Sequence, residues 1–244
     1  MPRITQMWLA TAVLTLLLTP LAVDPAAADL LGPTPYTSFS ADSPFRGVTF
    51  NGYFQFENFD DHALNAPGVS VNSGAAVSTS SGFNGSIIDQ VGLAGGCPPG
   101  GAAVACDTLF FGSGATGFTF TFNAGVLGAL PTHAGVVWTD GAAAIHFHAF
   151  DQNGAEISPP GLTGNHADGS FNGTIEEDRF YGAINAGGIS RIVISNDSGG
   201  IEVDDLQYGL VTGQVSTVPE PSSLLLLGLG ALGVGWRKRR SSRR

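Results

Sequence analysis

Apolar and polar residues alternate with a period of two along much of the chain. The run 118–122 is the clearest example, because it reads Phe-Thr-Phe-Thr-Phe and places three aromatic rings on one face of an extended segment. The same alternation predicts strands at 48–50, 54–57, 144–150, 189–195 and 200–208. No amphipathic helix of useful length is predicted. We therefore expect a chain of many short strands.

Turn-forming residues separate these segments. They are Asp140-Gly141, Asn153-Gly154, Asn172-Gly173, 185–188 and 196–200. Glycine accounts for 35 of the 244 residues, which argues against a helical protein. The pattern predicts an all-β domain over residues 29–211, an antiparallel β-sandwich or jelly roll, with 29–36 as a leader into it.

The N-terminus has the pattern of a secretory signal peptide. Arg3 precedes an apolar run over 7–18, Pro20 interrupts it, and small residues follow at 26–28. The run is too short to span a bilayer of about 30 Å comfortably. We therefore expect residues 1–28 to be removed and the mature chain to be exported.

The C-terminus has the pattern of a short membrane anchor. An apolar stretch over 222–236 is followed by four bases at 237–240, which predicts a single short transmembrane helix with its C-terminus in the cytoplasm. Residues 212–217 form a linker between the body and this segment. The sequence alone also allows a generic tail anchor.

Residues 218–244 resemble the PEP-CTERM sorting signal, because Pro219, Glu220 and Pro221 precede a Gly/Leu-rich helix and a basic end. The resemblance implies a Gram-negative bacterium that makes exopolysaccharide. It also implies an exosortase, a membrane-embedded cysteine transpeptidase that cleaves the tail at the inner membrane. The product would then reach the cell surface or the extracellular matrix.

A second resemblance concerns the end of the body. Residues 178–209 resemble the closing strands of galactose-binding-like jelly rolls. In that fold the final strand often carries an acidic residue near a structural calcium.

The charge of the body excludes one class of partner. The whole chain has a formal charge of −10, but residues 29–217 hold 18 acids against three bases, a charge of −15. Nucleic-acid binding needs clustered Lys and Arg to displace counterions, so we expect no such partner. The charge suits a hydrated matrix and divalent cations.

Two groups of acids are candidate calcium ligands. The residues are Glu57, Asp60, Asp61, Asp204 and Asp205. The first and last strands of a jelly roll are commonly neighbours, so this fold would allow the two groups of acids to lie close together. Calcium takes six to eight oxygen ligands. The alternative is a solvated acidic surface. The acidic run 176–178 is interpreted as a loop face in which Arg179 screens its neighbours.

Cysteine and histidine offer two further candidates. Cys97 and Cys106 enclose a short Gly/Pro-rich loop, and in an exported protein a disulfide is expected. His146 and His148 share one face of a strand. They would bind a metal only with a third ligand, so an outward-facing pair is the simpler interpretation.

No motif of a hydrolase, zinc protease or nucleotide-binding enzyme is present. We therefore predict a non-enzymatic structural or adhesive protein of the cell surface or exopolysaccharide matrix. The first alternative is a carbohydrate-binding module with a structural calcium. The second is an extracellular polysaccharide-active enzyme.

Overall fold

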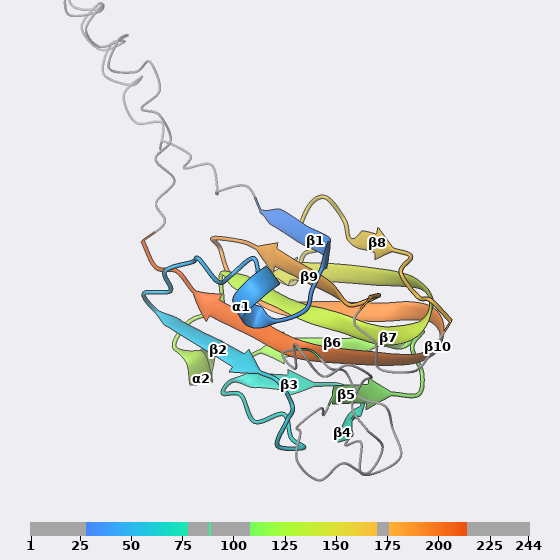
Figure 1. Cartoon of the computed structure of the whole chain (residues 1–244). Helices are drawn as coiled ribbons and strands as arrows, with labels where there is room; N and C mark the ends of the chain where they lie inside the picture. Colours follow the sequence, from blue (N-terminus) through green and yellow to red (C-terminus); the bar gives the residue numbers. More distant parts are fainter. Residues whose placement is uncertain (1–27, 78–87, 89–107, 170–175, 214–244) are drawn as a thin grey trace, which may run out of the picture.

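The computed structural model describes residues 28–77, 88, 108–169 and 176–213, which form a folded body (Figure 1). Its strands are β1 (Asp29–Pro35), β2 (Tyr53–Glu57), β3 (Val69–Val71), β4 (Ala75–Val77), β5 (Thr108–Phe111), β6 (Phe118–Phe122), β7 (His133–Asp151), β8 (Leu162–Gly164), β9 (Arg179–Ile184) and β10 (Ile189–Leu210). Two helices of four residues each, α1 (Phe39–Asp42) and α2 (Ala124–Leu127), complete the described elements. All strand pairs are antiparallel, which confirms the all-β prediction.

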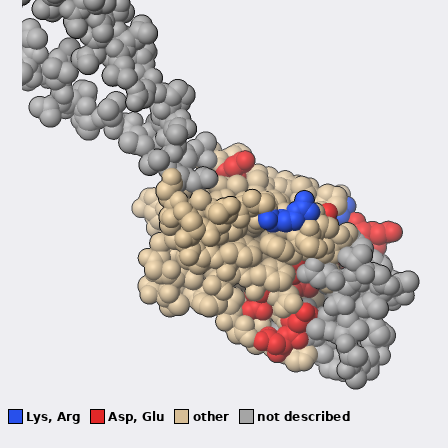
Figure 2. All heavy atoms as spheres, turned by 60° about the vertical axis from the view of Figure 1, so that its left-hand side comes forward, with Lys and Arg blue, Asp and Glu red and all other residues tan. Residues whose placement is uncertain are grey.

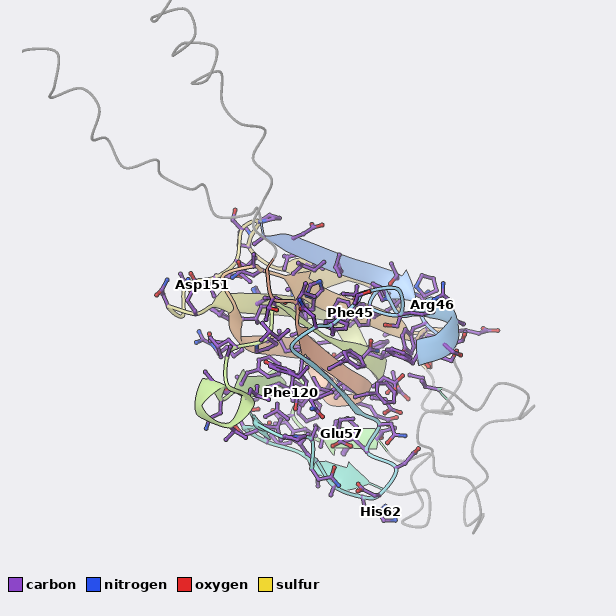
Figure 3. All side chains as sticks on the ribbon, turned by 90° about the vertical axis from the view of Figure 1, so that its left-hand side faces the viewer. Phe45, Arg46, Glu57, His62, Phe120 and Asp151 are labelled. Carbon is purple, nitrogen blue, oxygen red and sulfur yellow. The ribbon has the colours of Figure 1, made fainter. Side chains whose placement is uncertain are left out.

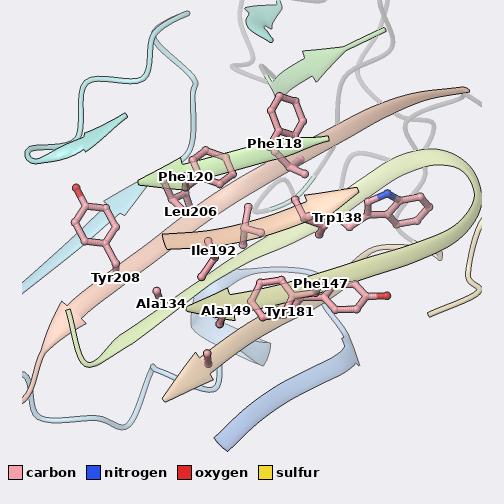
Figure 4. Packing of buried hydrophobic residues seen from close by; sticks show 14 of the residues in the cluster. Phe118, Phe120, Ala134, Trp138, Phe147, Ala149, Tyr181, Ile192, Leu206 and Tyr208 are labelled. Atoms are coloured by element: carbon pink, nitrogen blue, oxygen red, sulfur yellow. The ribbon is translucent and has the colours of Figure 1, made fainter. Parts of the chain in front are cut away.

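All ten described strands belong to one antiparallel sheet, and its two longest strands, β7 and β10, contribute to both of the layers into which the sheet bends. They pair with each other along almost their whole length. The N-terminal half of β7 also pairs with β9, and its C-terminal half pairs with β8. Likewise β10 pairs first with β6 and later with β5 and β2. One layer therefore contains β1, β9, β2, β5 and β4, the other contains β8, β6 and β3, and Figure 4 shows β7 curving from one to the other.

The change of layer takes place at Gly141 and at residues 196–200. Gly141 has a φ of 155°, and a Cβ there would lie 2.2 Å from the Asn196 side chain. Asn196 is itself fixed, since its Oδ1 accepts a hydrogen bond from the indole of Trp138 and its Nδ2 donates to the carbonyl of Gly200. The predicted turns at 140–141 and 196–200 are therefore wrong as chain reversals between separate strands. They are bends within two continuous strands.

The inner core lies between the layers and consists of alternating apolar residues. Phe118, Phe120 and Phe122 of β6 point into it, as predicted, whereas Thr119 and Thr121 do not. From the opposite layer come Trp138, Tyr181 and Tyr208, among others (Figure 4). Burying an apolar side chain of this size stabilises the fold by roughly 1.5–3 kcal/mol. The apolar positions of the period-two pattern are therefore the ones that face the inner core.

A second, smaller core covers the outer face of the β9–β7–β10 layer. It consists of Tyr36, Phe45, Ile88, Val137 and Phe180. The segment after β1 supplies the first two of these residues, and Figure 3 shows Phe45 lying over the strands. This layer is consequently buried on both faces.

The N-terminal part of the body differs from its prediction in two places. The expected leader 29–36 is mostly strand β1, because the backbone of residues 29–35 pairs with the edge of β9. The expected strand 48–50 is not a strand. The segment begins in a turn, in which the Val48 amide donates a hydrogen bond to the Phe45 carbonyl. The ring of Phe50 packs against the ring of Phe45.

Candidate functional site: a buried acidic cluster

Two β-bulges place pairs of consecutive polar residues on the outer face of the β9–β7–β10 layer. In β10 the register shifts between Asp204 and Gln207, so Asp204 and Asp205 both lie outside while Val203 and Leu206 point into the inner core. Asp205 has a φ of 45°, which a short polar side chain tolerates better than most. The extra residue of the bulge interrupts the alternation of inward and outward side chains along β10.

The second bulge lies in β7. Here Glu202 of β10 pairs with Asp140, and the next residue, Val203, pairs with Trp138. Thr139 is therefore the extra residue of β7. Thr139 donates a hydrogen bond to Glu202 at 3.2 Å, which places both on the outer face. Asp140 lies directly opposite Glu202 and shares that face.

These bulges help to assemble an acidic cluster in which six of seven carboxyl residues are buried. Its members are Asp60, Asp140, Glu177, Asp178, Glu202, Asp204 and Asp205, and only Asp60 is partly exposed. Figure 2 shows exposed acidic side chains at several separate places on one face of the body, whereas the buried members of the cluster contribute little to the surface. Such burial of like charges is costly unless protons, hydrogen bonds or cations compensate it.

The electrostatics of the cluster follow from this burial. Burial raises the pKa of Asp140 to about 7, opposed by a hydrogen bond from the Gly141 amide and assisted by the charges of Glu177 and Asp168. Burial also raises the pKa of Asp178 well above its usual value. The pKa of Asp204 is raised in the same way, first by burial, then by Asp205, with smaller contributions from Asp60 and Glu202. Neighbouring carboxyl charges therefore add to the effect of burial in raising the pKa of Asp140, Asp178 and Asp204.

One half of the cluster is tied to the N-terminal segment by side-chain hydrogen bonds. The Tyr36 hydroxyl donates to Asp205 at 2.6 Å and accepts from the Gln207 amide at 2.9 Å. Ser43 donates to the other end of the Gln207 side chain. This network joins residues about 170 positions apart and fixes the segment that covers the outer core.

The predicted calcium ligands divide into two groups. Strands β2 and β10 are neighbours, with Glu57 opposite Leu206, so the two groups of acids lie on or beside adjacent strands. Asp60 acts electrostatically on Asp204, which lies beside Asp205. Glu57 and Asp61 have local roles instead.

Glu57 caps the loop that follows β2. Its two carboxylate oxygens accept hydrogen bonds from the amides of Phe59, Asn65 and Ala66. Asp61 is exposed and accepts from the Ala63 amide and from a side chain of the same loop. Figure 3 shows Glu57 beside this loop, which also carries His62.

Four members of the cluster were missed by the sequence analysis: Asp140, Glu177, Asp178 and Glu202. The interpretation of 176–178 as a loop face is wrong for two of them, because Glu177 is 3% and Asp178 0% exposed. Arg179 donates hydrogen bonds to the main-chain carbonyls of Glu176 and Asp178, and its charge partly opposes the raised pKa of Asp178, as the screening role expected. The sequence holds a signal for Asp140 alone, which with Thr139 forms two consecutive polar residues inside a strand, whereas Glu202 lies in regular alternation and Glu177 and Asp178 precede β9.

The other candidates are resolved in part. His146 and His148 are half-buried on an outer face and contact Asp197 and Glu156, in agreement with the outward-facing interpretation. Within the described ranges, no three His, Cys, Asp or Glu side chains are already placed to hold a metal ion. The calcium ligands therefore stay a prediction.

Several predictions lie outside the described residues. They are the signal peptide 1–28 (all but residue 28), the Cys97–Cys106 disulfide, most of the linker 212–217 and the segment 218–244 with its anchor helix. In the part of the chain that the structure describes, no helix is long and apolar enough to cross a membrane.

Comparison with known proteins adds one match. Residues 217–240 match the PEP-CTERM protein-sorting motif, which confirms the resemblance at 218–244. The motif implies an exported protein that is held transiently at the membrane and processed by an exosortase. Neither a curated protein nor a solved structure matches the chain. The galactose-binding-like assignment of the body thus stays a prediction.

Proposed function

We propose that this chain is a non-enzymatic structural or adhesive protein of the cell surface or exopolysaccharide matrix of a Gram-negative bacterium. The observation that carries the proposal is the sorting motif at 217–240, which begins seven residues after the last strand ends at Leu210. The body delivered by that motif has a formal charge of −15 over residues 29–217, which suits a hydrated, cation-rich matrix.

The sorting part of the proposal is tested by changing Pro219, Glu220 and Pro221 to alanine. We expect the variant to accumulate as full-length protein in the inner-membrane fraction, because the exosortase no longer recognises its tail. A matched control changes Gln214 and Ser216 of the linker to alanine and should be released normally. Immunoblots of membrane, surface and medium fractions measure the distribution. Normal release of the triple variant would contradict the assignment.

The non-enzymatic part needs its own measurement. Purified protein is incubated with the producer's own matrix polysaccharide, and reducing ends and released sugars are quantified. We expect no release above a heat-inactivated control. Reproducible turnover that one carboxylate substitution abolishes would establish the polysaccharide-active enzyme instead.

A carbohydrate-binding module with a structural calcium is a second candidate, favoured by the approach of Asp60 to Asp204 and Asp205 across the β2–β10 pair. Carboxylate oxygens are suitable calcium ligands. Glycan-array binding with calcium and with chelator tests it, together with Asp60→Asn. Glycan retention that depends on calcium and on Asp60 would support this candidate, and no retained glycan would count against it.

A further inference from the structure

The polar atoms of the Asp178 side chain are buried without hydrogen bonds to neighbouring groups in the described part of the protein. Its side chain is fully buried, yet neither carboxylate oxygen has a hydrogen-bond partner among the residues that the structure describes. Buried polar atoms nearly always have a partner, and an exception calls for a physical explanation. The adjacent base does not provide one, because Arg179 donates to main-chain carbonyls.

The charges of three further carboxyl residues act on Asp178. Glu177 precedes it in the chain, and Asp140 and Glu202 lie on the next two strands of the layer. The register establishes this order, since Trp138 of β7 lies opposite Arg179 and Asp140 lies opposite Glu202. All three of these acids are at most 6% exposed. Their charges add to the effect of burial in raising the pKa of Asp178.

Protons alone do not satisfy this arrangement. A protonated Asp178 would carry a hydroxyl that needs an acceptor, and no acceptor lies within hydrogen-bond distance of either oxygen in the described part of the chain. A cation does satisfy it, because it contacts both oxygens directly and neutralises the neighbouring charges at the same time. The two explanations therefore differ in what Asp178 contacts.

We infer that Asp178, together with Asp140, Glu177 and Glu202, binds a hard divalent cation, calcium in preference to magnesium. Oxygen-only ligands select hard cations. Calcium accepts irregular coordination at 2.3–2.6 Å, whereas magnesium demands a near-ideal octahedron. Because no three of these side chains are placed to hold a metal ion in the structure, binding requires them to move toward the ion.

This site is separate from the calcium of the carbohydrate-binding candidate. That calcium would rest on Asp60, Asp204 and Asp205, beside β2, whereas the new site rests on the end of β9. Glu202 lies between the two groups and acts on both Asp178 and Asp204. Substitutions at Asp178 and at Asp60 consequently report on different ions.

The test compares four forms of the full chain, purified in detergent and stripped with EDTA. They are the wild type, Asp178→Asn, Asp60→Asn and the matched control Glu176→Gln, which removes an exposed acid two residues from Asp178. Each is titrated with CaCl2 by calorimetry and melted with CaCl2, with MgCl2 and with EDTA. At about a hundredfold excess of calcium over its Kd, we expect the wild-type and Glu176→Gln melting temperatures to rise by about 5–10 °C.

We expect Asp178→Asn to lose this rise while melting at or above the wild-type temperature in EDTA. The substitution removes an unpaired buried charge, so folding itself should not suffer. Asp60→Asn should keep the Asp178-dependent rise. A calcium response that persists in Asp178→Asn, a wild type without any response, or a larger response to magnesium would each overturn the inference. A response lost in Asp60→Asn alone would leave the carbohydrate-binding candidate standing and this site refuted.

Discussion

The inner core and the outer face of the same layer are equally buried but are built from different chemistry. The inner core is aromatic and aliphatic, with Phe120, Ile192 and Trp138 all fully buried. The outer face combines a small aromatic cluster with six buried carboxyl residues. Burial of apolar side chains on the inner side therefore stabilises the fold by itself. Burial of carboxyl residues on the outer side is costly unless protons, hydrogen bonds or cations compensate it. This free-energy cost of burying carboxyl residues is the reason why the proposed cation site is placed on the outer side.

Truncation of an inner ring should have the largest effect. Phe120→Ala leaves a cavity between the layers, and we expect it to lower the free energy of unfolding by about 3–5 kcal/mol. Thr121→Ala, on the exposed side of the same strand, should change it by less than about 0.5 kcal/mol. Urea denaturation followed by circular dichroism measures both. Similar losses in the two variants would contradict the two-layer core.

Two buried tyrosines sharpen the comparison further. Tyr36→Phe removes the hydroxyl that links Asp205 to Gln207, so we expect a loss of about 1–3 kcal/mol. Tyr181→Phe removes a hydroxyl that has no partner within the described residues, so its cost should be near zero or the variant should gain stability. Denaturation curves at neutral pH compare them. Equal costs would show that the outer network adds nothing to stability.

The smallest effect should be a pH dependence at the outer cover. Burial lowers the pKa of His133, whose ring packs edge-on against Phe45 and Phe50. Below the unfolded-state value of about 6.5 the unfolded chain takes up a proton that the folded chain resists, so stability should fall as the pH falls. His133→Phe keeps a ring but removes the proton site. Its stability should decline less than that of the wild type between pH 7 and 5, and parallel profiles would refute this.

The alternation of apolar residues predicted several of the strands that contact the inner core but not β3, β5 or β9. The segment 118–122 coincides with β6, and 54–57 and 144–150 lie within β2 and β7. It did not predict β1, because a strand that contributes mainly backbone pairing at an edge needs no alternation. Nor did it predict that 189–210 is one strand, because Asn-Asp-Ser-Gly-Gly is equally compatible with a turn and with a bend.

The acidic cluster was predicted only at its β2–β10 side. Asp204 and Asp205 were predicted because acids are close together in the sequence there and because the first and last strands of a jelly roll are commonly neighbours. Asp140 and Asp178 were not, since they come together through bulges and through the order of β9, β7 and β10, which no local pattern encodes. Register is a property of strand pairs, so it became visible only in the fold.

The position of β10 in both layers has a consequence for export. A chain that crosses a membrane N-terminus first presents β7 long before residues 189–210, and neither layer is complete without them. Contacts between distant segments form slowly, so the body stays open until its final strand arrives. Only a few residues then separate that strand from the sorting motif. The strand that completes both layers is thus also the last strand before the sorting motif.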